Sequence, residues 1–175
     1  MSTTYTFRSS IGAVCLTEDD GSITRIGLTD VADEPLAPTP LLREAEQQIL
    51  AYLRGERQQL DFPIRMVGTP FQQRVWRALQ QIPYGSTRTY GEVASAIGNP
   101  RASRAVGMAC NKNPLLLIIP CHRVVGSGGK LTGFAYGTDA KQWLLELEEE
   151  AMLTSTIAPD QVVGIPPQGY LPSLQ

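Results

Sequence analysis

The sequence predicts an α/β N-terminal domain, a small antiparallel sheet plus a helix, followed by a mainly α C-terminal domain with a helix-turn-helix. Short runs of β-forming residues occupy the start of the chain, whereas residues 70–153 carry apolar residues at helical spacing. The composition, 42% apolar and 18% charged, is that of an ordinary globular protein. We expect domains at residues 1–65 and 66–153, and an extended, proline-rich tail at 154–175.

The first domain begins with three short strand candidates, at residues 5–9, 12–16 and 23–28. Gly21 lies in a polar turn before the last of them and can adopt the positive φ of a hairpin. Three prolines in residues 34–40 exclude regular structure there. Apolar residues spaced by three and four predict a helix over 42–53, and residues 60–64 are a further strand candidate.

The second domain begins with a helix for which Thr69 is the expected N-cap and Pro70 the first residue. Two short helices are expected next, the first over 90–97 and the second from Arg101, with a glycine-containing turn between them. Such a pair is typical of a helix-turn-helix, although glycine turns also join helices in many proteins that bind no DNA. A final helix is expected over 139–153.

The charge of the chain is divided unevenly along the sequence. Nine basic residues and a single acid, Glu92, occupy residues 65–130, which gives that stretch nine minus one, or +8. Because the whole chain carries −2, the remainder carries −10. A basic block in an acidic chain favours a polyanionic partner such as nucleic acid, unless these side chains only solvate helix faces. The basic residues are Arg65, Arg74, Arg77, Arg88, Arg101, Arg104, Lys112, Arg123 and Lys130.

The three cysteines are odd in number and widely spaced, which argues against a disulfide framework or a structural zinc site. They favour a reducing compartment, and we expect the cytoplasm, or the nucleus in a eukaryote. The N-terminus lacks the basic start and apolar stretch of a signal peptide. The longest strongly apolar run, residues 115–119, is too short to cross a membrane.

The only histidine of the chain, His122, directly follows Cys121. A thiol is a strong nucleophile only as the thiolate, and an imidazole is the usual group that makes it near neutral pH. Neighbouring side chains point apart, so a base at this position would act through a water molecule. A buried packing cysteine beside a hydrogen-bonded histidine is the alternative, and the pair by itself leaves both interpretations open. The glycine-rich residues 126–133 lack the spacing of a phosphate-binding P-loop.

Residues 69–148 contain a set of motifs that belong together. They are Thr89-Tyr90-Gly91-Glu92, Arg104-Ala105-Val106-Gly107, Asn113-Pro114, Pro120-Cys121-His122-Arg123-Val124 and Trp143-Leu144-Leu145 with Glu148. In these motifs and their spacing the chain resembles the O6-alkylguanine-DNA alkyltransferase family. The resemblance implies a single-use protein that flips an alkylated guanine, or O4-alkylthymine, out of the duplex and moves the alkyl group to Cys121.

The partner implied by the resemblance is double-stranded DNA that carries alkylated guanine, with no membrane, no metal and no cofactor. We expect a monomer, and cooperative binding along DNA stays open. The family's helix-turn-helix enters the minor groove, which suits a protein indifferent to sequence.

The resemblance also assigns roles to individual residues. Cys121 becomes the nucleophile and His122 its base through water, while Glu148 orients the imidazole and Asn113 braces the active-site turn. Glu148 is selected over its acidic neighbours only by its distance from the tryptophan of the motif. The DNA-binding residues are Arg104, which replaces the flipped base, Tyr90 at the target phosphate, Arg101 and Arg123; the pocket residues are Tyr90, Val124, Phe134 and Ala135.

Some residues depart from the family pattern or leave alternatives open. Tyr136 stands where many relatives have a smaller Gly-Gly pair, and it either narrows the pocket or points outward. Cys110 is expected near the pocket wall as a packing residue and not as a second nucleophile, and Cys15 in the core. The rival functions are a lesion-binding protein without chemistry, a cysteine hydrolase and a transcription regulator. The presence of Cys121 argues against the first, and the lack of a second histidine argues against the hydrolase.

Overall fold

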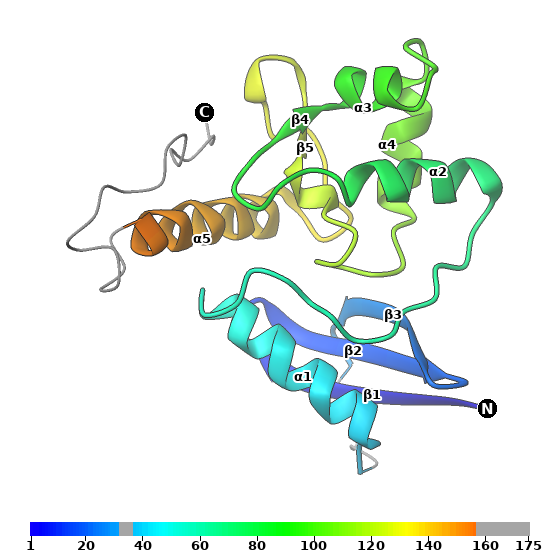
Figure 1. The fold of residues 1–175 in the computed structure, drawn as a ribbon, viewed down its shortest axis with the longest axis vertical. Coiled ribbons are helices and arrows are strands. Elements are labelled where there is room, and N and C mark those ends of the chain that lie inside the picture. Colours follow the sequence, from blue (N-terminus) through cyan, green and yellow to red (C-terminus); the bar gives the residue numbers. More distant parts are fainter. Residues whose placement is uncertain (32–36, 157–175) are drawn as a thin grey trace.

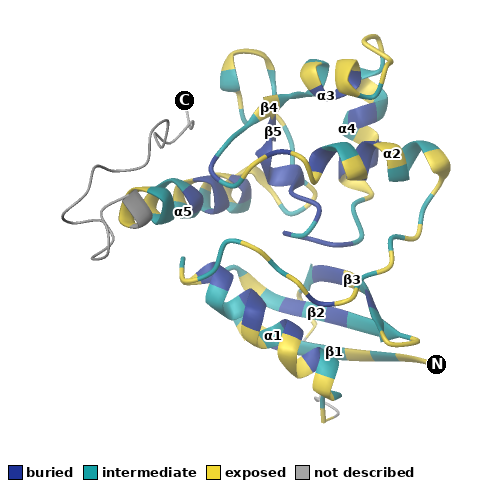
Figure 2. Cartoon of the chain, viewed as in Figure 1, coloured by how far each residue is buried: buried dark blue, intermediate teal, exposed yellow. Residues whose placement is uncertain are grey.

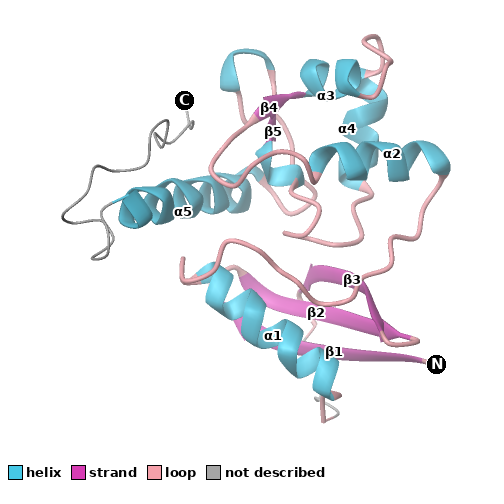
Figure 3. Cartoon of the chain, in the orientation of Figure 1, coloured by secondary structure: helices cyan, strands magenta, loops and turns pink. Residues whose placement is uncertain are grey.

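The computed structural model describes residues 1–31 and 37–156. Its N-terminal part is an antiparallel sheet in the order β1-β2-β3, with one helix packed against it (Figures 1 and 3). This arrangement confirms the predicted α/β class of the N-terminal part. The proline-rich segment at 34–40 lies partly outside the described residues. Of the tail expected to be extended at 154–175, residues 154–156 are instead helical, and residues 157–175 lie outside the described residues. The elements are β1 (Ser2–Ser9), β2 (Gly12–Asp19), β3 (Ser22–Thr29) and α1 (Pro40–Leu53).

The hairpin between β2 and β3 and the start of α1 follow from local chemistry. Asp20 and Gly21 both adopt positive φ, as the tightest hairpin turns require, and Asp19 pairs with Ser22 across the turn. The side chain of Thr39 accepts a hydrogen bond from the backbone of α1, and a proline follows it at the first helical position. The face of α1 that packs on the sheet contains Leu42, Ala45, Ile49 and Tyr52, all buried (Figure 2).

The C-terminal part is mainly helical, as predicted. Its first helix begins with a reciprocal capping box between Thr69 and Gln72. The second helix of the expected helix-turn-helix begins at Ser103 and not at Arg101, and no side chain caps it. Two short parallel strands, which the sequence did not predict, join the helical pair to the segment after Cys121. The elements are α2 (Pro70–Leu79), β4 (Arg88–Thr89), α3 (Tyr90–Ala96), α4 (Ser103–Asn111), the 3-10 turns η1 (Cys121–Arg123) and η2 (Ser127–Gly129), β5 (Val124–Val125) and α5 (Thr138–Thr156).

The strand expected at residues 60–64 does not form. Only Ile64 makes a β-bridge, opposite Ile23 of β3. The Ile23 N–H donates to the carbonyl of Pro63, and the Arg65 N–H donates to the carbonyl of Ile23. A proline has no N–H to give to a ladder, which limits this pairing to a single bridge.

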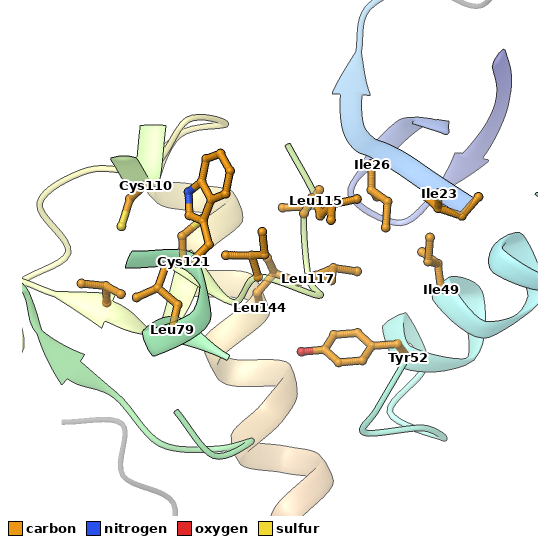
Figure 4. Packing of buried hydrophobic residues seen from close by; sticks show 14 of the residues in the cluster. Ile23, Ile26, Ile49, Tyr52, Leu79, Cys110, Leu115, Leu117, Cys121 and Leu144 are labelled. Carbon is orange, nitrogen blue, oxygen red and sulfur yellow. The ribbon is translucent and has the colours of Figure 1, made fainter. Parts of the chain in front are cut away.

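The outer edge of β3 also pairs with the segment that leads to Cys121. Ile26 donates to the carbonyl of Pro114 and accepts from the N–H of Leu116. Between them, Leu115 is fully buried and lies next to Ile26 in Figure 4. Leu117, also buried, adopts φ +75°, a conformation uncommon for a residue with a Cβ atom. The N-terminal sheet is therefore part of the support for the turn that carries Cys121.

None of the helices formed by the described residues is both long enough and apolar enough to span a membrane.

Candidate active site

Cys121 is the first residue of η1 and is almost completely buried, with 4% of its surface exposed. The side-chain amide of Asn113 donates to its Sγ at 3.0 Å and to the carbonyl of Ile119 at 2.7 Å. The carbonyl oxygen of the same side chain accepts from the N–H of Leu115 at 2.8 Å, so Asn113 is held at both ends. Burial raises the pKa of Cys121, while the hydrogen bond from Asn113 and the nearby Lys141 act to lower it.

His122 points away from the thiol, as adjacent residues of a 3-10 turn must. Its Nε2 lies 2.5 Å from Oε2 of Glu148, and its side chain is fully buried. The other ring nitrogen, Nδ1, is also buried and makes no hydrogen bond to any residue that the structure describes. Burial lowers the pKa of His122 against the opposing effect of the Glu148 carboxylate. The imidazole is therefore suited to accept a proton at Nδ1.

Glu148 is the centre of a buried network that joins three parts of the chain. Arg123 donates to both carboxylate oxygens from Nε, at 2.9 and 3.2 Å, and to Oε2 from its terminal nitrogen at 3.0 Å. The Gly85 N–H donates to Oε1 at 2.9 Å, and the hydroxyl of Tyr52, from α1, donates to Oε2. Burial alone would raise the pKa of Glu148, but His122 and Arg123 hold it well below its usual range. The permanent charge of Arg123 keeps the carboxylate ionised even when His122 is neutral.

Arg123 does not lie where the sequence analysis placed it. It was expected at the DNA, but only 7% of it is exposed. Besides its bonds to Glu148, it donates to the carbonyl of Ile82 at 2.8 Å, and its guanidinium lies 5.4 Å from the centre of the Tyr84 ring. Since a buried carboxylate needs a charged partner, the arginine of this motif is a structural counter-ion for Glu148 and not a DNA contact.

Lys141, which the sequence analysis missed, is a second buried charge beside the thiol. It has no exposed surface, donates from Nζ to the carbonyl of Gly133 at 2.7 Å and lies 5.7 Å from the centre of the Tyr90 ring. Burial lowers the pKa of Lys141, and the thiols of Cys121 and Cys110 act to raise it. Lys141 precedes Leu144 by about one helical turn and Glu148 by about two turns, and all three side chains are buried. That spacing is the signal in the sequence that could have revealed it.

Of the acidic residues at the end of α5, Glu148 is buried, whereas Glu146 and Glu150 are exposed and Glu149 is half-buried. The spacing of apolar residues in this helix predicts a buried face of Trp143, Leu144, Leu147 and Met152, and this prediction was partly wrong. Trp143 is only half-buried, and the face packed into the protein contains Lys141, Leu144, Leu145 and Glu148.

A cleft of about 430 Å³ opens beside α4 and contains two of the expected residues, Tyr90 and Arg104. Its other lining residues are Ser103, Gly107, Met108, Asn111, Thr132 and Gly133. Val124, Phe134 and Ala135, expected in the pocket, do not line this cleft. Val124 is buried in the short strand β5, Phe134 is half-buried and Ala135 is exposed.

Tyr90, which lines the cleft, is half-buried. Burial raises the pKa of Tyr90, and the charges of Cys110 and Cys121 act in the same direction. Cys110 is itself buried on α4, as expected of a packing residue, and burial raises its pKa to about 12. A thiol with such a pKa is inert near neutral pH. Cys15, also expected in the core, is only half-buried.

The remaining basic residues of the 65–130 stretch are all exposed. Arg65 pairs with Asp19 at 2.5 Å, and Arg88 lies 3.9 Å from Glu92. Arg101, in the turn before α4, and Arg104, on α4, have no ion-pair partner among the described residues. A buried thiol thus occurs together with exposed arginines at the helical pair that have no ion-pair partner among the described residues, which defines a thiol-dependent protein of the nucleic-acid-binding class. No three His, Cys, Asp or Glu side chains of the described ranges gather as metal ligands would.

Comparison with known proteins identifies the family of this chain. The family model described as the DNA-binding domain of 6-O-methylguanine DNA methyltransferase matches residues 70–150. A methylated-DNA–protein-cysteine methyltransferase of Methanosarcina acetivorans is 47% identical over 148 residues, which cover 81% of this chain and 95% of the relative. The constitutive enzyme of that name from Bacillus subtilis is 41% identical over 153 residues, 82% and 93% of the two chains.

Solved structures give the same result. The Mycobacterium tuberculosis O6-methylguanine methyltransferase is similar with a TM-score of 0.79 and 42% identity, over 93% of this chain and 98% of that one. The M. tuberculosis OGT in complex with DNA has a TM-score of 0.77 and 44% identity, over 85% of this chain and 93% of that one. This chain belongs to the methylated-DNA–protein-cysteine methyltransferase family.

Proposed function

We propose that this protein repairs double-stranded DNA by transferring an alkyl group from O6 of guanine, or O4 of thymine, to the sulfur of Cys121 in a single turnover. The observation that carries the proposal is a buried Cys121 thiol, bound by Asn113 and followed by a His122–Glu148 pair, in a chain of this family. The similar M. tuberculosis protein described in complex with DNA supports a DNA partner. A reducing compartment, the cytoplasm, suits a protein that needs its thiol free.

The reaction is a displacement at the alkyl carbon. The proton of Cys121 passes through a water molecule to Nδ1 of His122, which burial keeps neutral and able to accept it. The thiolate then attacks the alkyl carbon, so that a sulfur–carbon bond forms and the bond between that carbon and guanine O6 breaks. The guanine departs with the bonding electrons and takes up one proton, which balances the proton that Cys121 gave to His122 and that the imidazolium then releases. The thioether has no easy hydrolytic exit, and one protein molecule is consumed for each lesion.

Charges near the sulfur offset the cost of forming a thiolate in a buried site. The Asn113 amide donates directly to Sγ, and the Lys141 ammonium acts to lower the pKa of the thiol. The ionised Glu148 stabilises the imidazolium that forms on His122. Lys141 and Glu148 thus act as positioning residues, each through the group that it faces.

The DNA-binding surface is the exposed face of α3 and α4. The alkyl carbon is hidden in the base stack until the nucleotide is flipped into the cleft. Arg104, at the edge of the cleft, takes the place of the flipped base, and its planar guanidinium can stack and donate hydrogen bonds there. Tyr90 also lines the cleft and contacts the target phosphate, and Arg101 contacts the DNA backbone. We expect the protein to act as a monomer.

The chemistry is tested by mass spectrometry after incubation with duplex DNA containing O6-methylguanine. We expect one added methyl group per molecule, on the peptide that contains Cys121, and none in Cys121→Ser. Repeated turnover, label on Cys110, or binding without transfer would each refute the proposal, and the last would favour a lesion-binding protein.

The role of Arg104 is tested by comparing two substrates. In Arg104→Ala we expect repair of duplex DNA to slow at least tenfold, while the reaction with the free base O6-benzylguanine is unchanged, because only the duplex must be opened. Lys130→Ala, an exposed cation outside the cleft, is the matched control. If Arg104→Ala slowed the reactions with duplex DNA and with the free base equally, Arg104 would not be the residue that takes the place of the flipped base.

A further inference from the structure

Tyr52 connects the N-terminal part of the chain to the buried network around Glu148. Its ring is 1% exposed and lies in the buried face of α1. The ring also makes an edge-on contact with Tyr84, with 5.8 Å between the ring centres and an angle of 82°. The hydroxyl points away from α1 toward the C-terminal part (Figure 4). Because packing fixes the ring, it also fixes the position of the hydroxyl.

The proton of this hydroxyl is directed at Glu148. Arg123 donates from a terminal nitrogen to the Tyr52 oxygen at 3.5 Å, and a guanidinium can only donate. The proton that belongs to Tyr52 therefore goes to Oε2 of Glu148, an ionised carboxylate that can only accept. Burial and the charge of Glu148 raise the pKa of Tyr52 well above its ordinary value, so the phenol keeps this proton near neutral pH.

Tyr52 and His122 share one oxygen of Glu148. Nε2 of His122 lies 2.5 Å from Oε2, the same atom that accepts from Tyr52. A hydrogen bond to a carboxylate stabilises its negative charge, which leaves less of that charge to attract the proton of a second partner. The Tyr52 hydroxyl therefore weakens the attraction between Glu148 and the imidazolium form of His122.

The other charges around His122 act in different directions. Burial lowers the pKa of His122, the Glu148 carboxylate acts to raise it, and the charges of Arg123 and of Lys141, from α5, act to lower it. Glu148 thus favours the protonated imidazole, whereas the two cations disfavour it. Because Tyr52 competes for Oε2, the loss of its hydroxyl should make the imidazole easier to protonate.

We propose that Tyr52 is a positioning residue for alkyl transfer: acting through Glu148, it keeps the imidazole of His122 neutral and ready to take the proton of Cys121. The inference rests on the proposed function, in which Nδ1 of the neutral His122 accepts that proton. Tyr52 itself makes and breaks no covalent bond. In this way α1, an element of the N-terminal part, contributes to chemistry that occurs in the C-terminal part.

The test follows His122 directly, because it is the only histidine of the chain. In protein that contains isotope-labelled histidine, NMR gives the pH at which half of this imidazole is protonated. In Tyr52→Phe we expect this midpoint to move to higher pH by about half to one unit, the effect of one hydrogen bond. At neutral pH, the resonance of the proton on Nε2 should move downfield, because its hydrogen bond to Oε2 becomes stronger.

The transfer rate from a duplex that contains O6-methylguanine, measured against pH, should follow the same change. Below the midpoint of the wild type, we expect the rate of Tyr52→Phe to be roughly three- to tenfold lower than that of the wild type. Well above both midpoints the two rates should agree within about threefold, because a slightly stronger base changes proton transfer only modestly.

Two further variants separate this role from a loss of stability. Ile49→Val removes one methyl group from the same buried face of α1, so it is the matched control and should leave the histidine spectra and the pH profile unchanged. A ring-fluorinated tyrosine at position 52 is a stronger donor that keeps the shape of the ring. It should move the midpoint to lower pH, and it decides the outcome if Tyr52→Phe does not fold.

The outcomes also separate this inference from the proposed function. If the midpoint and the Nε2 proton do not move in Tyr52→Phe, or move as much in Ile49→Val, the inference is overturned and the proposed function stands. A shift of the midpoint to lower pH would also overturn it, because Tyr52 would then support the imidazolium. If the wild-type protein transfers no alkyl group, the proposed function fails, whatever the histidine spectra show.

Discussion

The contact between Tyr52 and Glu148 makes a specific prediction about the stability of this protein. The Tyr52 ring is buried on α1, and its hydroxyl points out of the N-terminal part toward α5 (Figure 4). It donates to a buried carboxylate that also receives bonds from His122 and Arg123. Replacing Tyr52 with Phe removes this one donor and leaves the shape of the packed ring unchanged.

The size of the effect follows from the charge of the acceptor. A hydrogen bond to an ionised group contributes about 1.5–3 kcal/mol to stability. The Glu148 carboxylate keeps its bonds from His122, Arg123 and Gly85 in the variant, so it is not left unpaired. We therefore expect the free energy of unfolding to fall by about 2 kcal/mol. For a chain of this length that corresponds to a fall in Tm of about 4–8 °C.

Urea unfolding measures this change directly. We expect the midpoint of Tyr52→Phe to fall with an unchanged slope, since the variant exposes the same surface on unfolding. Ser10→Ala, which removes a hydroxyl at an exposed position after β1, is the control and should change stability by less than about 0.5 kcal/mol. A loss in Tyr52→Phe no larger than that of the control would refute the view that this hydroxyl binds an ionised Glu148.

Two further predictions concern the thiol and the backbone around Glu148. Lys141→Met removes a positive charge that lowers the pKa of Cys121, so we expect the transfer rate to rise with pH at higher pH values than in the wild type. Thiolate absorbance and the transfer rate, both measured against pH, follow this change. A pH profile that does not move, as expected for the control Lys130→Met, would contradict the prediction. Gly85→Ala should destabilise the protein by at least about 1–2 kcal/mol more than Gly128→Ala in thermal unfolding. Both glycines have positive φ, +79° and +72°, but only a Cβ at position 85 would meet another side chain within 3 Å. Equal losses in the two variants would show that backbone conformation alone matters.

The site is assembled from the 3-10 turn η1 and the helix α5, which bring residues of opposite charge to Cys121 and His122. In η1, the adjacent Cys121 and His122 point in different directions. On α5, Lys141 and Glu148 lie on one face about 10 Å apart, which is two helical turns. The cation of α5 therefore lies near the thiol and the anion meets the imidazole. A single helix thus supplies opposite charges to two consecutive residues.

Much of the fold could be predicted from local patterns. The strands of the first hairpin, the capped start of α2 and the helical pair all follow from turn residues, caps and apolar spacing that act over a few positions. The prediction of a strand at residues 60–64 was wrong because β-propensity does not consider whether each residue can donate an N–H to a partner strand. Pro63 has no backbone N–H to donate. The start of α4 was placed two residues early because no side-chain cap marks it.

The sequence by itself determined the chemistry of this protein: a single Cys121-His122 pair, a family motif around it and a basic block ahead of it. Only the tertiary structure decided how the charged residues divide their roles. Arg123 and Lys141 carry charged side chains that the sequence alone suggests are exposed, yet both are buried. Arg123 binds Glu148, and Lys141 lies near the thiol of Cys121, and in each pair the two residues come from distant segments of the chain. The hydroxyl of Tyr136 likewise lies against Gly27 of β3, more than a hundred residues earlier in the chain. Helical spacing can show that Lys141 shares a face with buried residues, but which partner a charged residue meets is decided only when distant segments pack together.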